Sequence, residues 1–303
     1  MVDCRSVRLL IKCLIINIII IEYLRLHAKK YFPWLQKPWR IILKLKGIKG
    51  YILKGKRQLN FRYKLARNQP YFGHVLSAMQ TDPRRESYMK QLICKETNNL
   101  TDSDFTMLEV GAWAGRSSII WADVIKKNTT GFLTCVDVWE PFESTTEKGA
   151  YLPWMQKALG NRKVFNLFLH NIAVLGLEDT IKPYKGSSER VLPTLRDNFF
   201  NMVFIDGSHQ YSHVTIDIEH GARLTTEGGI LCGDDLELQM QDVDETKCRK
   251  CKEEDYIEDP KTGIGYHPGV ALAVYEYFKT EVSCYNGFWV MRKTKDGWLS
   301  VHL

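Results

Sequence analysis

The chain has 303 residues, of which 45% are hydrophobic and 12% aromatic, and this composition excludes a disordered or collagen-like protein. The charge is uneven: residues 1–67 carry 17 Lys and Arg against 2 Asp and Glu, whereas the remainder carries 25 against 33. We therefore predict a basic N-terminal arm (residues 1–70) and a globular domain (residues 71–303) that meet different partners.

The arm opens with an apolar stretch, residues 9–24, that is interrupted by Lys12, Asn17 and Glu22. A membrane-spanning helix needs about 20 predominantly apolar residues, so this stretch falls short of one. No small-residue cleavage site follows it, which argues against a cleavable signal peptide. Basic and aromatic residues alternate through residues 1–67, as is typical either of a segment on an anionic membrane surface or of a solvated arm. Both alternatives stay open, and we expect the domain to be cytoplasmic.

Eight cysteines are scattered through the predicted strands and helices, as is typical of buried free thiols. Only Cys248 and Cys251, in the sequence CRKC, have the spacing of metal ligands. A zinc site needs two further ligands at comparable spacing, and no second CxxC supplies them. The pair is therefore open to two interpretations, a metal site that ties the surrounding segment or simply two thiols.

From about residue 71 onward, short apolar runs alternate with helical patterns. Such alternation predicts an α/β fold with a mostly parallel sheet and helices on both faces. Near the C-terminus, Asn286-Gly287 between two strand-like runs predicts a tight antiparallel hairpin. The predicted parallel strands are Thr106–Val110, Phe132–Val136, Ile181–Tyr184, Met202–Ile205 and Gly229–Gly233.

The first predicted strand continues into LEVGAWAGRSSII, residues 108–120. Gly111 and Gly115 would let the backbone turn sharply and approach a ligand, and Ser117 lies at a helix start whose free N–H groups attract an anion. The GxxxG spacing differs from the GxGxxG of nicotinamide-dinucleotide sites. Asp137 ends the second strand, where a carboxylate can accept hydrogen bonds from both ribose hydroxyls. Together these features favour a nucleoside ligand.

The motifs LEVGAWAGRSS, CVD, KGSSERVLPTL, VFIDGSH and GGILCGDD, between Tyr71 and Arg292, resemble the class I S-adenosylmethionine-dependent methyltransferases. Within that class they look most like the cation-dependent O-methyltransferases of the catechol and macrolide-sugar types. The resemblance implies a Rossmann-like seven-stranded sheet of order 3-2-1-4-5-7-6 with strand 7 antiparallel. It also implies that S-adenosylmethionine is held at its amino-acid end by Glu109, Gly111, Trp113 and Ser117, at its ribose by Asp137, and on its adenine side by Ser188 and Glu189.

Acidic residues end two neighbouring predicted strands, Asp206 the fourth and Asp234 and Asp235 the fifth. Adjacent parallel strands bring their carboxyl ends together, so these carboxylates should converge, and hard oxygen ligands suit Mg²⁺ or Mn²⁺. The 28-residue step from Asp206 to Asp234 is similar to that of the catechol-type metal ligands, and the macrolide-sugar enzymes carry a histidine where His209 stands. We predict that the cation lowers the pKa of a hydroxyl and that His209 removes its proton.

Residues 236–266 form a polar insertion with few helix or strand signals. Long irregular insertions in compact domains are usually functional lids or disordered segments. Over this fold the insertion would overhang the metal, so we expect it to select the acceptor together with His267 and residues 141–160. His213 and His220 have helical spacing and are predicted not to be catalytic.

Three functions remain open at this point. The leading one is an S-adenosylmethionine-dependent, divalent-cation-assisted O-methyltransferase that acts on a hydroxyl of a glycan, sugar-containing or other small polyhydroxy metabolite. A nucleic-acid methyltransferase could use the basic arm for phosphate contacts, but the fourth strand ends in DGSH and lacks the [DN]PP[YF] signature of base methylation. A non-catalytic, membrane-associated cofactor-binding module is disfavoured by the three acids and His209.

Overall fold

A computed structural model describes residues 53–73, 82–100, 104–141 and 152–303. The backbone contacts divide the chain into two units, residues 1–56 and residues 57–303. Most of the predicted basic arm, with its apolar stretch, and residues 142–151 lie outside the described residues, so membrane binding by the arm stays a prediction. No helix in the described part of the chain is long and apolar enough to cross a membrane.

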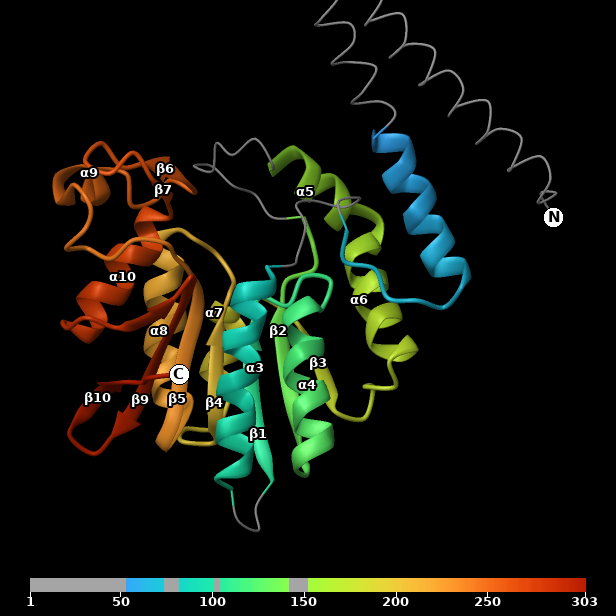
Figure 1. The fold of residues 1–303 in the computed structure, drawn as a ribbon, viewed down its shortest axis with the longest axis horizontal. Coiled ribbons are helices and arrows are strands. Elements are labelled where there is room, and N and C mark those ends of the chain that lie inside the picture. The colour runs from blue at the N-terminus through green and yellow to red at the C-terminus, as the bar shows by residue number, and fades with distance from the viewer. Residues whose placement is uncertain (1–52, 74–81, 101–103, 142–151) are drawn as a thin grey trace, which may run out of the picture. The chain divides into compact units, whose positions relative to one another are not determined.

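The second unit is built on one eight-stranded sheet (Figure 1). Its path is β10-β9-β5-β4-β1-β2-β3; the five strands from β3 to β5 are parallel, and β9 runs antiparallel to β5. The predicted α/β class and the order of the parallel strands are confirmed. The strands are β1 (Phe105–Val110), β2 (Gly131–Asp137), β3 (Ile181–Lys185), β4 (Phe200–Ile205), β5 (Thr225–Leu236), β8 (Ser283–Tyr285), β9 (Gly287–Thr294) and β10 (Gly297–Ser300).

The C-terminal strands confirm the predicted hairpin and add one strand to the predicted seven. Asn286 and Gly287 have φ angles of 58° and 91° between the paired residues Tyr285 and Phe288, as a tight two-residue hairpin turn requires. β8 pairs with the first part of β9, and β10 pairs with the rest of the same edge. The family that the motifs resemble has seven strands, so the prediction did not include the short β10.

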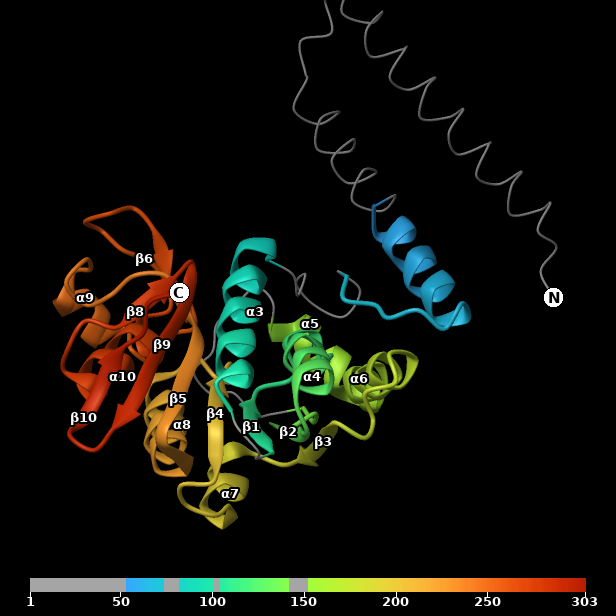
Figure 2. The ribbon, with the colours of Figure 1, turned by 60° about the horizontal axis from the view of Figure 1, so that its bottom comes forward.

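Helices cover both faces of the sheet, so the second unit has three layers (Figure 2). One apolar cluster joins the sheet to α3, α4 and α6, and a second joins it to α8 and α10. Every residue of β1 is buried, as expected of a central parallel strand covered on both faces. The helices are α3 (Pro83–Asn98), α4 (Arg116–Asn128), α5 (Leu152–Leu159), α6 (Lys163–Val174), α7 (Ser188–Val191), α8 (Tyr211–Leu224), α9 (Glu245–Lys250) and α10 (Pro268–Phe278).

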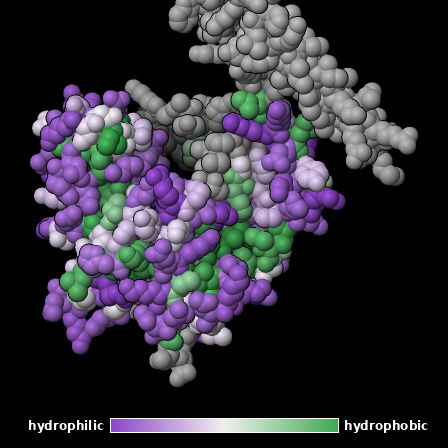
Figure 3. All heavy atoms as spheres, viewed as in Figure 1, coloured by the Kyte–Doolittle hydropathy of each residue, from purple (hydrophilic) through white to green (hydrophobic). Residues whose placement is uncertain are grey.

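The outer surface differs from these clusters in polarity. On the face that α3 and α4 cover, hydrophilic side chains predominate and apolar ones form smaller groups among them (Figure 3).

Upstream of α3, residues 57–66 are helical, and Phe61 of this segment packs edge-on against Tyr71 with ring centroids 5.2 Å apart. The described end of the predicted arm therefore contributes to the core of the second unit.

The insertion (residues 236–266) is more regular than its sequence predicts. It contains α9 and a small antiparallel pair, β6 (Ile257–Glu258) and β7 (Gly265–Tyr266). Asp259 stabilises it by accepting hydrogen bonds from the backbone N–H groups of Asp244, Lys261 and Thr262 at 2.7, 3.0 and 2.9 Å. Hydrogen bonds to this one side chain thus order a segment that lacks the hydrophobic periodicity from which helices and strands are predicted.

Cys248 and Cys251 are buried free thiols in this insertion. The Cys248 thiol lies 3.4 Å from the Pro268 carbonyl oxygen and 3.5 Å from the Met240 sulfur. Among the described residues, neither cysteine belongs to a group of three side chains arranged to hold a metal ion. The second interpretation of CRKC, two packed thiols, therefore fits the described part of the chain.

Candidate active site

The loop after β1 is held by the side chain that ends β2. Asp137 Oδ2 accepts the backbone N–H groups of Ala112 and Trp113 at 3.0 and 2.8 Å, and its Oδ1 accepts that of Trp139 at 2.8 Å. Gly115 closes the loop as the residue before α4. The predicted cofactor loop and Asp137 therefore lie together, and the first role of this carboxylate is to shape the loop. A contact with ribose stays a prediction.

Gly111 makes the turn of this loop possible. Its φ is +88°, and a Cβ atom built on it would lie 1.9 Å from the Asp206 carbonyl oxygen and 2.7 Å from the Gly207 Cα. Only glycine fits this close approach of the β1 loop to the segment after β4.

We expect Gly111→Ala to destabilise the protein far more than Gly228→Ala. Gly228 has a similar φ of +78°, and no atom of the described residues lies within 4 Å of a Cβ built there, so alanine costs only the left-handed backbone strain of about 1–2 kcal/mol. At Gly111 the overlap with Asp206 adds to that cost. Denaturant unfolding of both variants measures the difference, and equal losses would contradict the close approach.

Glu109 is a buried carboxylate at the end of β1 with spare hydrogen-bonding capacity. Its Oε2 accepts hydrogen bonds from the Ser118 hydroxyl and, at 3.2 Å, from the Cys135 thiol. Its Oε1 has no partner within the described part of the chain. Burial raises the pKa of Glu109 to about 7, although the Ser117 and Ser118 hydroxyls oppose the shift. A buried carboxylate with a free oxygen suits an ammonium group, such as that of an amino-acid ligand.

Ser188 and Glu189 open α7, apart from the loop after β1. Ser188 hydrogen-bonds to Asp217 of α8, and Glu189 Oε1 lies 3.5 Å from His213 Nε2. His213 also contacts Ser208, with 3.1 Å between Nδ1 and Oγ. These contacts join α7 to α8, and the predicted adenine contacts stay a prediction.

The three predicted acids meet at the carboxyl ends of β4 and β5. Oxygen atoms of Asp206, Asp234 and Asp235 lie within 4.8 Å of one another. They line a small pocket together with His209, Val270 and Trp289.

A bulge in β5 explains how two consecutive acids reach one place. Neighbouring residues of a regular strand point to opposite faces. Here Gly233 pairs with Trp289 but Leu236 pairs with Gly287, so β5 carries one extra residue, and Asp235 has a φ of 63°. Bulges of this kind redirect side chains next to active sites. The sequence contains the Asp-Asp pair but no local sign of the bulge.

The three acids repel one another, and the side chains of Arg85 and His209 lie against them. Burial, followed by the charges of Asp234 and Asp235, raises the pKa of Asp206 well above its ordinary value. Burial and Asp235 also raise the pKa of Asp234 to about 7, against the opposing charge of Arg85. Arg85, from α3, hydrogen-bonds to Asp234 through Nη1, which lies 3.7 Å from Asp235 Oδ1. Sequence reasoning missed Arg85, which lies 149 positions from its partner.

His209 lies in the loop between β4 and α8, with a carboxylate at each ring nitrogen. Its Nε2 is 3.0 Å from Asp235 Oδ2, and its Nδ1 is 2.6 Å from Asp255 Oδ1. Burial opposes the charged form, but the hydrogen bonds and charges of Asp235 and Asp255 outweigh it and raise the pKa of His209 well above its ordinary value. Asp255 belongs to the insertion and was not singled out from the sequence.

His267 lies beside His209, with the ring centroids 4.0 Å apart. Its position follows from Gly269 at the start of α10, where a Cβ atom would lie 2.2 Å from the His209 carbonyl oxygen and 2.5 Å from the Tyr211 nitrogen. Such a contact needs glycine, and it brings the residue just before α10 next to His209. The insertion and His267 therefore adjoin the acids, and their role in selecting the acceptor stays a prediction.

Residues 108–236 match the family model described as a methyltransferase domain. The match runs from β1 through β5 and includes the loop after β1, Asp137, Asp206, His209 and both acids of β5. No curated protein matches the chain.

Two solved structures show the extent of the structural likeness. The O-methyltransferase from Bacillus cereus in complex with SAH is 15% identical with a TM-score of 0.48, over 80% of this chain and 91% of that one. The O-methyltransferase TomG from Streptomyces achromogenes, in complex with SAM, is 15% identical with a TM-score of 0.46, over 76% and 86%. At such values the likeness alone carries no argument about activity.

The family match covers most of the parallel part of the sheet and the acids at its carboxyl edge, but not the antiparallel strands β8, β9 and β10. Residues 108–236 thus form a methyltransferase domain, as the motifs predict.

We expect Asp137→Ala to weaken S-adenosylmethionine binding by about 1–3 kcal/mol, the usual cost of leaving buried polar groups without partners. The N–H groups of Ala112, Trp113 and Trp139 would lose their acceptor. Calorimetry measures the affinity, and Glu140→Ala is the control because Glu140 is exposed and pairs only with Lys185 among the described residues. Unchanged affinity for Asp137→Ala would refute this role.

Proposed function

We propose that the protein is a divalent-cation-assisted O-methyltransferase that methylates a hydroxyl of a glycan, a sugar-containing compound or another small polyhydroxy metabolite. The observation that carries the proposal is the position of His209 between Asp235, at the group of three acids, and Asp255. A histidine oriented on one side and facing a candidate metal group on the other is suited to remove a proton from a hydroxyl held there.

The donor set of the acid group fits Mg²⁺ or Mn²⁺. Asp206, Asp234 and Asp235 offer hard oxygen ligands within 4.8 Å of one another, in a pocket where their charges repel. Bound there, a divalent cation would neutralise these charges and lower the pKa of a coordinated hydroxyl. Glu109, whose buried Oε1 has no partner among the described residues, likewise fits the ammonium of S-adenosylmethionine.

The residues around the site would have different roles in the reaction. Glu109 and the loop held by Asp137 bind and orient the sulfonium cofactor, because a methyl group is transferred in line with the attacking oxygen. Asp255 fixes Nδ1 of His209, so that Nε2 faces the acids and can accept the hydroxyl proton. The oxygen–carbon bond forms as the carbon–sulfur bond breaks, and the proton stays on His209.

Nε2 must be unprotonated to do this. Asp235 and Asp255 favour the charged imidazolium, despite burial. The base is therefore competent only when Asp235 has another partner or the pH is high.

One observation favours a methyl transfer that needs no cation. The guanidinium of Arg85 already forms an ion pair with Asp234, one of the three candidate metal ligands. If Arg85 and a metal compete for this carboxylate, Arg85→Ala should bind Mg²⁺ about tenfold or more tightly than the wild type, since hydrogen bonds to charged groups contribute about 1.5–3 kcal/mol. Calorimetry measures the two affinities. Arg84→Ala is the matched control, because Arg84 is 77% exposed and lies only near Asp82 among the described residues. An Arg85→Ala affinity no higher than that of the wild type would contradict the competition.

The proposed activity is tested by incubating the protein with S-adenosylmethionine, Mg²⁺ and fractionated glycans and polyhydroxy metabolites. New methyl ethers, detected by mass spectrometry, are the expected result. Cofactor binding without a methylated product would instead favour the non-catalytic binding module. Methylated nucleic acid would favour the nucleic-acid methyltransferase.

A further inference from the structure

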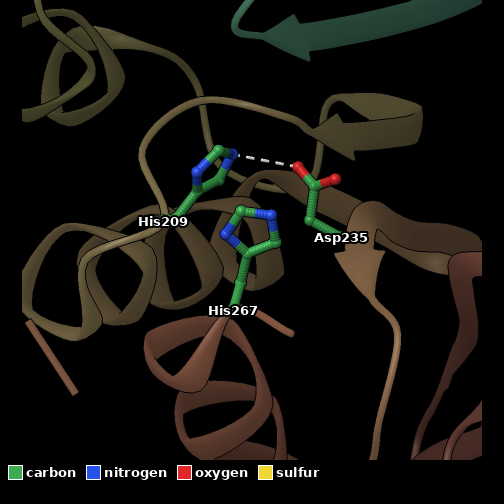
Figure 4. Close-up of side chains that lie close together, drawn as sticks. All are labelled: His209, Asp235 and His267. Carbon is green, nitrogen blue, oxygen red and sulfur yellow. Dashed lines mark ion pairs between the residues drawn. The ribbon is translucent and has the colours of Figure 1, made fainter. Parts of the chain in front are cut away.

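Two histidines and one carboxylate meet where the insertion adjoins the acid group. His209 comes from the loop after β4, Asp235 from the bulge of β5, and His267 from the residue before α10 (Figure 4). One ligand atom from each lies within 4.8 Å of the other two. The side chains are between 12% and 29% exposed, so the group is shielded but open to a small ion.

Both histidine rings are held from behind by Asp255. His209 Nδ1 lies 2.6 Å from the Asp255 carboxylate, and His267 Nδ1 lies 2.5 Å from the Asp255 backbone carbonyl oxygen. The carbonyl only accepts, so His267 Nδ1 donates and its Nε2 has the lone pair. Histidines that bind metals typically donate the other ring N–H to a carboxylate or a backbone carbonyl in this manner, which fixes the tautomer and the ring orientation. A single residue does so here for both rings.

The backbone around the group fixes the distance between its parts. Gly269 packs against the His209 carbonyl oxygen, and the Tyr211 N–H donates to the Lys252 carbonyl oxygen at 3.0 Å. The insertion, the loop after β4 and the start of α10 are thus joined by backbone contacts. A site held in this way needs little rearrangement on binding.

We propose that His209, Asp235 and His267 form a second divalent-metal site, which takes a nitrogen-preferring transition ion such as Zn²⁺ or Co²⁺. Imidazole ligands suit these ions, whereas the all-oxygen group of Asp206, Asp234 and Asp235 suits Mg²⁺. Asp235 is common to both sets. Two neutral imidazoles and one carboxylate leave positions of the ion open for water or another ligand.

Occupation of this site would withdraw His209 from proton transfer, because its Nε2 lone pair would bind the metal. Transition ions should then inhibit methyl transfer that Mg²⁺ supports. This consequence, unlike the site itself, rests on the proposed function.

The test is a Co²⁺ titration of the full chain, freed of metal, followed by visible absorption. Saturation near one equivalent, without the near-ultraviolet absorption of thiolate ligands, is the expected result. His267→Gln, which keeps a polar side chain, should abolish this absorption, and Asp255→Ala should weaken binding about 10–100-fold. His213→Ala, a control on α8 that lies outside the group, should bind like the wild type. Circular dichroism verifies that each variant is folded.

Binding by folded His267→Gln equal to that of the wild type would overturn the site, as would a spectrum dominated by thiolate absorption. The titration needs neither cofactor nor acceptor. Failure to bind Co²⁺ therefore leaves the proposed methyl transfer intact, and failure of methyl transfer leaves the metal site intact.

Discussion

We expect His209→Ala to lower the turnover number by about 10²–10⁴-fold, the usual contribution of a positioned general base. Affinity for S-adenosylmethionine should stay close to that of the wild type, because the His209 ring pairs with Asp235 and Asp255, whereas the loop after β1 is held by Asp137. His213→Ala is the matched control, since its ring contacts only Ser208 and Glu189 among the described residues. Equal turnover of His209→Ala and the control would rule out the base.

The pH dependence gives a second readout of the same residue. A base acts only after losing its proton, so turnover should rise with pH through the pKa of His209. Asp235 and Asp255 raise that pKa despite burial, so the rise should lie above the ordinary histidine value of about 6.5. Raising the Mg²⁺ concentration should move it to lower pH, because Asp235 then has another partner. His209→Ala should lack this rise.

Asp206→Asn should change stability and activity in opposite directions. Burial and the charges of Asp234 and Asp235 raise the pKa of Asp206 in the folded state. An acid with a raised folded pKa destabilises the fold increasingly as pH rises above the ordinary aspartate value of about 3.9. Without metal, the variant should therefore be at least as stable as the wild type at pH 8, and the difference should shrink toward pH 4.

Activity of the same variant should fall by at least about 10²-fold. A bound cation contributes several kcal/mol of transition-state stabilisation, and each 1.4 kcal/mol corresponds to a factor of ten. Thermal unfolding in EDTA and turnover in Mg²⁺ measure the two effects. A variant that loses stability and keeps its activity would show that the acids serve the fold and not the reaction.

The sequence predicts the framework of the site because that framework follows from local patterns. Apolar runs mark the parallel strands, and the residues just after them, Asp137 and Asp206, must lie at one edge of the sheet. Asn286-Gly287 likewise specifies its hairpin through the backbone angles that the turn requires. These features depend on short stretches of chain whose period and turn chemistry are visible in the sequence.

The partners of the site could not be predicted because they depend on distant contacts. Arg85 and Asp255 reach Asp234 and His209 across 149 and 46 positions, and nothing next to them distinguishes them from surface charges. The bulge at Asp235 is also imposed by pairing, since β5 must fit β9 on one side and β4 on the other. Burial and neighbouring charges then set pKa values that composition alone does not give.

The fate of a labelled methyl group tests the central claim most directly. The protein is supplied with S-adenosylmethionine that carries a trideuterated methyl group, with polyhydroxy acceptors, and with either Mg²⁺ or EDTA. We predict a trideuteromethyl ether on an acceptor oxygen in Mg²⁺, strongly reduced in EDTA and in His209→Ala. Label on a nitrogen or carbon atom, or oxygen methylation that neither EDTA nor His209→Ala diminishes, would contradict a cation-assisted O-methyltransferase with a histidine base.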